Sequence, residues 1–241
     1  MTELTALEDY AIRCPQKSLD LTDPADRLLR DFTVSGLRGL QTIADIGCGE
    51  GFLTSEFERW VGLIVGVDLS LTRCRKAKAK LKGDIIRADG RALPLADASV
   101  DGVICHQVIE HVREDRCVVA EIWRILKENG KMIISTVRRS GIRVSKRIDP
   151  AHVKEYSYSE VRGLLNTKGF EEFAFQGLGI DLVDPYLDFR IRKFFRSFSC
   201  ESVFLRSLDP IYRHLGRMKL PIWRVLAFKA QKRPVDNGGP A

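Results

Sequence analysis

Long apolar runs are missing from this 241-residue sequence, and so are the usual spacings of metal-binding cysteines. No uninterrupted apolar segment approaches the length of a membrane span, and the first residues lack the basic-then-apolar form of a signal peptide. The six cysteines are scattered, with no CxxC pair. We therefore expect a cytoplasmic protein with reduced thiols, no transmembrane segment and no metal site.

A large excess of charge of one sign is also missing. The formal net charge is +7, and it is unevenly spread, because residues 73–82 carry six Lys or Arg and no acid. Such a run usually forms a solvated helix face. The sequence therefore does not favour a nucleic acid as the partner, although it leaves an RNA partner open.

What the sequence does contain is an alternation of apolar runs and helix-like segments over its first two thirds. Runs rich in Val and Ile predict buried strands at 41–47, 63–69, 83–89, 100–106 and 130–136. The segments between them predict helices at 51–60, 71–81 and 113–130. This order predicts an α/β fold with a mostly parallel sheet and helices on both faces.

Further elements flank this core on both sides. Asp23 followed by proline predicts a helix over 23–40. Ser157 and Glu160 predict a capping box at the start of a later helix, which Gly169 closes.

Two more strands are expected at 170–177 and 223–232, and the long connection between them predicts an inserted cap. We therefore expect one domain over 1–241, made of an N-terminal helical segment (1–40), a ligand-binding core (41–176), the cap insertion (177–222) and the last strand (223–232).

The stretch IADIGCGEGF, residues 43–52, ends an apolar run in a glycine-rich turn. Its glycines, Gly47, Gly49 and Gly51, follow a GxGxG pattern, whereas a dinucleotide fingerprint requires its third glycine where Phe52 stands. A bare backbone between a strand and a helix lets a nucleotide-like ligand approach the main chain and the helix N-terminus.

Acids stand at the ends of three predicted strands. Asp45 precedes the first glycine by two residues, Asp68 ends the second strand, and Asp89 ends the third. The carboxyl ends of parallel strands meet at one edge, where ligands of open α/β sheets bind. A carboxylate in the position of Asp68 accepts hydrogen bonds from ribose hydroxyls in such sheets.

At this point the sequence resembles the class I S-adenosylmethionine-dependent methyltransferases, in the small-molecule branch with the ubiquinone/menaquinone-type domain. IADIGCGEGF looks like the first motif of that family and VGVDLS like its second. RADGRALPLADASVDGVICHQVIEHV (87–112) and EIWRILKENGKMIIST (121–136) are similar to its later motifs. The resemblance covers about residues 25–176. It implies a Rossmann-like seven-stranded sheet whose last strand is antiparallel, and an enzyme that uses S-adenosylmethionine and releases S-adenosylhomocysteine.

The resemblance also implies which residues hold the amino-acid end of the cofactor. Gly47, Cys48 and Gly49 would pass under it, and Asp45 would reach its ammonium directly or through water. Cys105, or its neighbour His106, would contact the methionine moiety through the backbone.

The nucleoside end is assigned in the same way. Asp68 would hold the ribose, and Leu69 would pack on the adenine. Asp89 would accept a hydrogen bond from the adenine amine, and the Gly90 N–H would contact a ring nitrogen.

A general base is needed only if the methyl acceptor carries a proton at the reacting atom. His106, at the active edge of the sheet, and His152, after the fifth strand, are the candidate catalytic residues. His111 fits a packing or capping role better, and His214 lies in the expected cap.

The methyl acceptor is the least determined feature. The residues CHQV after the fourth strand lack the Asn-Pro-Pro-Tyr pattern of enzymes that methylate nucleobase amino groups. Segment 177–222 interleaves basic and aromatic residues, which predicts either a self-contained helical cap or a mouth for an anionic or lipid-like acceptor or a membrane surface. We expect in-line methyl transfer to a small-molecule or lipid-like acceptor. An RNA methyltransferase and a non-catalytic S-adenosylmethionine-binding module remain alternatives, and the sequence assigns no oligomeric state.

Overall fold

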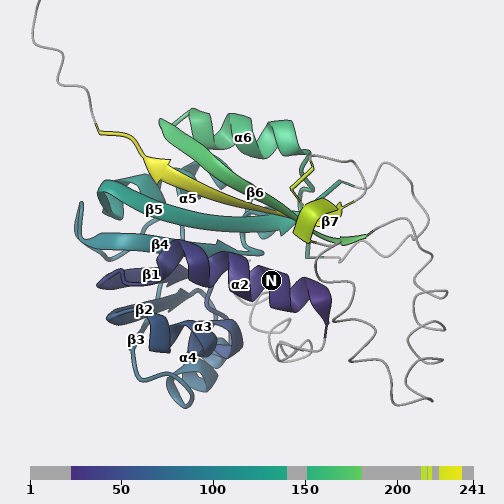
Figure 1. The fold of residues 1–241 in the computed structure, drawn as a ribbon. Coiled ribbons are helices and arrows are strands. Elements are labelled where there is room, and N and C mark those ends of the chain that lie inside the picture. The colour runs from purple at the N-terminus through teal and green to yellow at the C-terminus, as the bar shows by residue number, and fades with distance from the viewer. Residues whose placement is uncertain (1–22, 140–150, 181–212, 216, 219–222, 235–241) are drawn as a thin grey trace, which may run out of the picture.

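The computed structural model describes residues 23–139, 151–180, 213–215, 217–218 and 223–234. They form a seven-stranded sheet covered by helices (Figure 1). No helix among these residues is long and apolar enough to cross a membrane.

The sheet has the strand order β3-β2-β1-β4-β5-β7-β6. Its strands are β1 (Thr42–Ile46), β2 (Leu63–Asp68), β3 (Asp84–Arg87), β4 (Val100–His106), β5 (Leu126–Val137), β6 (Phe170–Ile180) and β7 (Trp223–Lys232). Neighbours from β3 to β5 pair in parallel, whereas β7 runs antiparallel to both β5 and β6. The predicted sheet with an antiparallel last strand is therefore confirmed.

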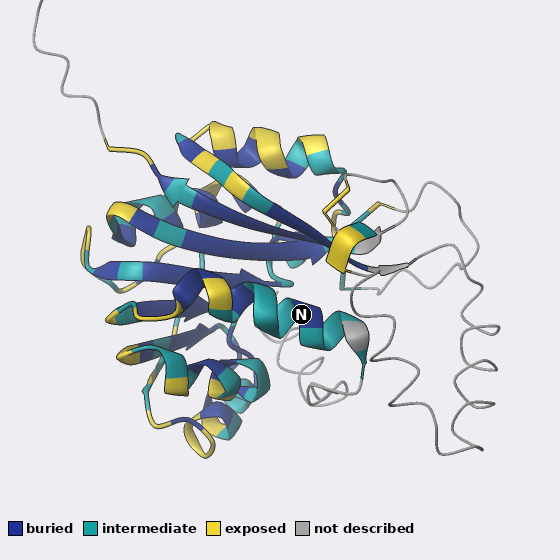
Figure 2. Ribbon diagram, viewed as in Figure 1, coloured by how far each residue is buried: buried dark blue, intermediate teal, exposed yellow. Residues whose placement is uncertain are grey.

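Alternate side chains of the central strands point into two different cores. Ile43, Ile104 and Ile133 belong to a core with Leu37 of one covering helix, whereas their strand neighbours belong to a larger core with Ile122 of another. This period of two arises because successive side chains of a strand point to opposite faces. Strands β4 and β5 are consequently buried along most of their length, as Figure 2 shows.

The helices are α2 (Pro24–Leu37), α3 (Phe52–Phe57), α4 (Leu71–Lys78), α5 (Asp115–Ile125) and α6 (Tyr158–Asn166), with short 3-10 turns η1 (Glu58–Trp60) and η2 (Ile109–His111). Their predicted caps are confirmed. The Asp23 side chain accepts a hydrogen bond from the Ala25 N–H, and Ser157 and Glu160 form the reciprocal capping box of α6.

Two predicted boundaries are wrong. Helix α5 ends at Ile125 rather than near residue 130, because Leu126 already pairs with Val100 in the sheet and Asn129 adopts a left-handed φ of 59°. Strand β6 continues to Ile180 because its end still pairs with β7, so residues 177–180 are strand rather than cap. Most of the remaining predicted cap lies outside the described residues.

Candidate functional site

The glycine turn after β1 adopts a backbone that only glycine forms without strain. Gly47, Gly49 and Gly51 have φ angles of 76°, 57° and 78°, all in the left-handed region. A Cβ on Gly47 would lie 2.3 Å from Cγ2 of Val108, in the loop that follows β4. The turn is therefore bare for two reasons, its dihedral angles and the close approach of Val108.

Asp68 ties this turn to the end of β2. Its Oδ2 accepts a hydrogen bond from the Gly49 N–H at 2.9 Å, and its Oδ1 accepts one from the Ser70 N–H at 2.9 Å. The Gly47 and Cys48 N–H groups also donate to the Val67 carbonyl, at 2.7 and 3.0 Å. The carboxylate, which is buried at 7% exposure, thus holds two loops in register.

The turn lies at the point where the strand order reverses. β1 has β2 on one side and β4 on the other, and ligands of open α/β sheets bind at the carboxyl edge beside such a reversal. Leu69, Asp89, Gly90 and Cys105 are at or just beyond the ends of β2, β3 and β4, on the same edge. The structure therefore brings the sequence-predicted cofactor residues together along one edge.

Asp45 is buried beneath the turn. Its Oδ2 accepts a hydrogen bond from Thr54 Oγ1 at 2.6 Å. Burial raises the pKa of Asp45 to about 7, and the nearby Asp68 charge adds to this shift, whereas the Thr54 hydrogen bond opposes it. Asp45 therefore changes its charge near neutral pH.

Asp89 is held by a neighbouring cation. Both carboxylate oxygens of Asp89 accept hydrogen bonds from the Arg91 guanidinium, at 2.7 to 3.1 Å. These bonds lower the pKa of Asp89. An adenine amine at Asp89 would have to share the carboxylate with Arg91.

Cys48 and Cys105 are buried thiols. Burial raises the pKa of both thiols, and the nearby acids add to the effect. Such thiols are not nucleophiles at neutral pH. Any contact they make with a ligand is therefore expected to come from backbone atoms or packing.

His106 is enclosed between two hydroxyl groups. Its Nε2 lies 2.9 Å from Thr33 Oγ1 and its Nδ1 lies 2.9 Å from Ser135 Oγ. Burial lowers the pKa of His106 to about 3. Because both ring nitrogens are occupied and the ring is hard to protonate, this geometry favours a structural role over the predicted one as a base.

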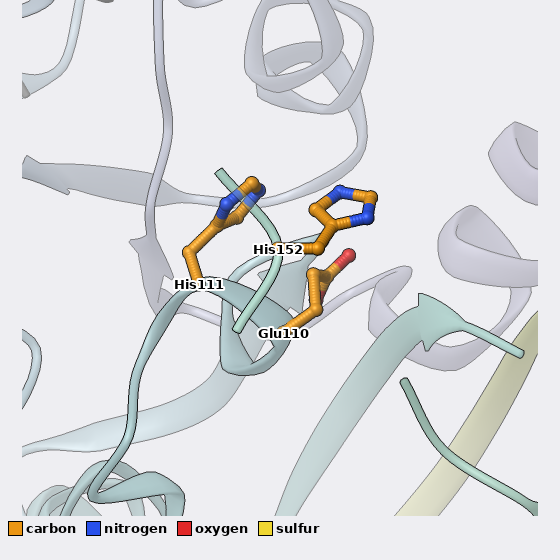
Figure 3. A group of neighbouring side chains, drawn as sticks. All are labelled: Glu110, His111 and His152. Atoms are coloured by element: carbon orange, nitrogen blue, oxygen red, sulfur yellow. The ribbon is translucent and has the colours of Figure 1, made fainter. Parts of the chain in front are cut away.

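His152 has a different environment, which the sequence did not foresee. It lies beside His111, with ring centroids 4.8 Å apart, and both lie next to Glu110 of η2 (Figure 3). Glu110 is fully buried and its Oε2 accepts a hydrogen bond from Thr136 Oγ1. Burial raises the pKa of Glu110 to about 7. The Glu-His pair was visible in the sequence, but no spacing rule connects it to His152.

Tyr156 links the 151–156 segment to η2 and to α5. Its hydroxyl oxygen lies 2.8 Å from Asp115 Oδ2 and 3.1 Å from the Ile109 carbonyl oxygen, two acceptors that share its one proton, and its side chain is fully buried. The segment that carries His152 is therefore anchored in the core.

Two surface hollows lie away from this edge. One is lined by residues of α6 and the start of β6, and the other by residues of α2, β6 and β7. Neither includes the glycine turn, so the candidate site rests on the arrangement of its residues rather than on the shape of an open cavity.

Comparisons with known proteins agree with this geometry. A family model described as a methyltransferase domain matches residues 44–134, which span the glycine turn and the ends of β1 to β4. Residues 44–134 are therefore similar to a methyltransferase domain. Helices α2 and α6 and strands β6 and β7 lie outside the matched region.

The match to curated relatives covers only part of each relative's length. A probable S-adenosylmethionine-dependent methyltransferase of Mycolicibacterium smegmatis is 31% identical over 149 residues, which is 59% of this chain and 58% of the relative. A ubiquinone biosynthesis O-methyltransferase of Xanthomonas oryzae is 27% identical over 134 residues, which is 52% of this chain and 54% of the relative. The chain thus spans little more than half the length of these relatives.

Solved structures share the fold at low sequence identity. A SAM-dependent methyltransferase from Archaeoglobus fulgidus has a TM-score of 0.63 at 18% identity, covering 95% of this chain and 99% of that one. The 1,6-didemethyltoxoflavin-N1-methyltransferase of Burkholderia thailandensis, solved with S-adenosylhomocysteine, has a TM-score of 0.62 at 17% identity, covering 96% and 87%.

The environment of Gly47 yields a stability prediction. Gly47→Ala places a Cβ in a left-handed backbone, which costs roughly 1–2 kcal/mol, and drives it into Val108. We expect a loss of at least that size in the free energy of unfolding, measured by urea denaturation. Gly163→Ala is the matched control, because a Cβ there meets no atom within 4 Å and should be neutral or stabilising. Equal effects of the two substitutions would contradict the prediction.

The raised pKa of Asp45 yields a pH prediction. The folded-state pKa of about 7 exceeds that of an unfolded aspartate, about 3.9, so the contribution of Asp45 to stability is present below pH ~4 and is lost as the pH rises through ~7. Relative to Asp45→Asn, the wild type should lose up to roughly 1.4 kcal/mol per pH unit in that window. Urea denaturation of both proteins between pH 5 and 8 measures the difference in their free energies of unfolding. Glu110 also titrates in this range, but it is present in both proteins, so its contribution cancels in the difference. A constant difference would show that Asp45 is ionised in the folded protein.

Proposed function

We propose that this chain transfers a methyl group from S-adenosylmethionine, by in-line displacement, to a small-molecule or lipid-like acceptor. The observation that carries the proposal is the bare glycine turn clamped by Asp68 at the reversal of strand order. Asp45 and Asp68 are buried carboxylates at the same edge, so the residues present fit a cofactor that carries positive charge.

In this proposal the residues of the edge keep the roles that the family resemblance implies. The turn from Gly47 to Gly49 lies under the amino-acid end and Asp45 faces the ammonium. Asp68 binds the ribose, and Leu69 with Asp89 lies at the adenine. The buried, acidic character of this edge supports the assignment, because the cofactor carries positive charge at its sulfonium and its ammonium.

When bound, S-adenosylmethionine supplies an electrophilic methyl group on a positively charged sulfur. The work left to the protein is to hold an acceptor in line with that methyl and to keep water out. Positioning of this kind is worth roughly 7–11 kcal/mol of the barrier. The rigid edge formed by β1, β4 and η2 supplies the fixed frame that such positioning needs.

The acceptor class is inferred from a named relative of this chain. The name of the Xanthomonas relative refers to O-methylation in ubiquinone biosynthesis, which fits an aromatic or lipid-like acceptor. The basic and aromatic segment expected to select the acceptor lies mostly outside the described residues. A cytoplasmic location and contact with a membrane surface therefore stay predictions.

Asp68 is the residue whose change tests cofactor binding. In Asp68→Asn the amide nitrogen cannot accept a hydrogen bond, so the side chain no longer accepts from both Gly49 and Ser70 and loses its charge at the ribose. We expect S-adenosylhomocysteine to bind at least about tenfold more weakly, since a hydrogen bond to a charged group is worth about 1.5–3 kcal/mol.

Isothermal titration calorimetry measures this affinity, and circular dichroism checks the fold. Asp84→Asn is the control, because Asp84 is exposed at the opposite end of the sheet. Unchanged affinity in a folded Asp68→Asn protein would remove Asp68 from the site.

Methyl transfer itself is tested with cofactor labelled on its methyl group. We expect label to pass to a component of a quinol, small-aromatic or lipid extract, and Asp68→Asn to reduce that transfer at limiting cofactor. Transfer to RNA alone would favour the RNA alternative. Tight cofactor binding with no transfer to any extract would favour a non-catalytic binding module.

A further inference from the structure

Glu110 has an unusual environment for an acidic side chain. It is fully buried in η2, and one oxygen, Oε2, accepts a hydrogen bond from Thr136 Oγ1 at 2.9 Å. The other oxygen, Oε1, is equally buried, and among the described residues no donor reaches it. A buried carboxylate oxygen of this kind is costly unless a donor or a cation compensates it.

A backbone hydrogen bond determines which ring nitrogen of His111 carries a proton. Its Nδ1 lies 3.0 Å from the Ala151 carbonyl oxygen, which can only accept a hydrogen bond. Nδ1 therefore carries a proton, and in the neutral form of the ring Nε2 is the nitrogen without one. A hydrogen bond from a histidine to a backbone carbonyl is the usual outer support of a metal-binding imidazole.

His152 is brought to the same place by backbone hydrogen bonds. The Val153 and Lys154 N–H groups both donate to the Glu110 carbonyl, at 2.8 and 3.2 Å. These bonds seat the start of the 151–156 segment directly on η2. The bond from His111 and the bonds to the Glu110 carbonyl both join η2 to the 151–156 segment. The fold therefore fixes the relative positions of Glu110, His111 and His152.

We propose that Glu110, His111 and His152 bind one divalent transition-metal ion, for which zinc is the reference probe. One ligand atom from each residue lies within 4.8 Å of the other two (Figure 3). Ligand atoms about 2.0–2.2 Å from a shared ion lie at most about 4.4 Å apart, so small side-chain rotations close the site. Two imidazoles and one carboxylate suit zinc, iron(II), manganese or cobalt better than magnesium or calcium, which prefer oxygen ligands.

The position of this ion would give it a role in the reaction, an inference that rests on the proposed function. Three protein ligands leave coordination positions open to a substrate. η2 follows β4 at the edge that carries the glycine turn, so the ion would lie at the same edge as the proposed cofactor site. The acceptor would then be an oxygen nucleophile such as a hydroxyl.

The bond changes are those of a simple displacement. If bound, the ion would supply positive charge beside the acceptor oxygen and so favour loss of its proton to solvent. The acceptor oxygen would form a bond to the methyl carbon, and the electron pair of the sulfur–methyl bond would return to sulfur. The products would be a neutral methyl ether and S-adenosylhomocysteine.

The metal site is tested by direct binding, independently of catalysis. Chelator-treated, untagged full-length protein is titrated with zinc by calorimetry and with cobalt by visible absorption. We expect one ion per chain, and at least tenfold weaker binding in Glu110→Gln, His111→Ala and His152→Ala. His214→Ala is the matched control, because His214 is exposed and is not one of the three clustered residues. Magnesium should compete poorly.

Each variant is also titrated with S-adenosylhomocysteine, which separates this proposal from the proposed function. Retained cofactor affinity together with lost zinc binding supports the site, and also shows that the variants fold. His152→Ala carries the test if Glu110→Gln does not fold, because His152 is only partly buried. Absence of zinc binding in the wild type, or binding that all three variants retain, would overturn the proposal. Methyl transfer to a hydroxyl acceptor at full rate in excess chelator would overturn the catalytic role alone.

Discussion

The clamp that Asp68 forms between two backbone loops is the interaction on which the rest of the site depends. By accepting from the Gly49 and Ser70 N–H groups, one carboxylate fixes the turn after β1 against the turn after β2. Together with the bonds from the Gly47 and Cys48 N–H groups to the Val67 carbonyl, these bonds hold the left-handed turn in one conformation.

The part of the edge that follows β4 is built by contacts between segments far apart in the sequence. The 151–156 segment docks on η2 through backbone bonds to Glu110 and through the Tyr156 hydroxyl. Val108, between β4 and η2, packs closely against Gly47 of the glycine turn. The loop after β4 is therefore in contact with the loop after β1.

Charge at this edge is opposite to that of the protein as a whole. The chain carries a net charge of +7, yet Asp45, Asp68 and Glu110 are all buried at or near the carboxyl edge of the sheet. Burial raises the pKa of Asp45 and of Glu110 to about 7, which marks two sites where positive charge from a ligand would offset a desolvation cost. An edge of this kind favours cationic ligands, whether a sulfonium, an ammonium or a metal ion.

Local sequence determined much of this protein. The apolar runs, the caps at Asp23 and Ser157, the glycine turn and the acids at strand ends all follow from neighbouring residues, because helices, strands and turns are set by short-range geometry. The parallel sheet then brings strand ends to one edge, which is why the cofactor residues could be named in advance. The roles of those residues came from the family resemblance rather than from spacing.

Only the tertiary structure decided what surrounds each candidate. His106 and His152 look equivalent in the sequence, but His106 is enclosed by Thr33 and Ser135 from other elements, whereas His152 meets Glu110 and His111. The end of α5 was likewise set by the pairing of Leu126 with Val100. Burial, hydrogen-bond partners and pKa depend on residues distant in the chain, and no local pattern encodes those contacts.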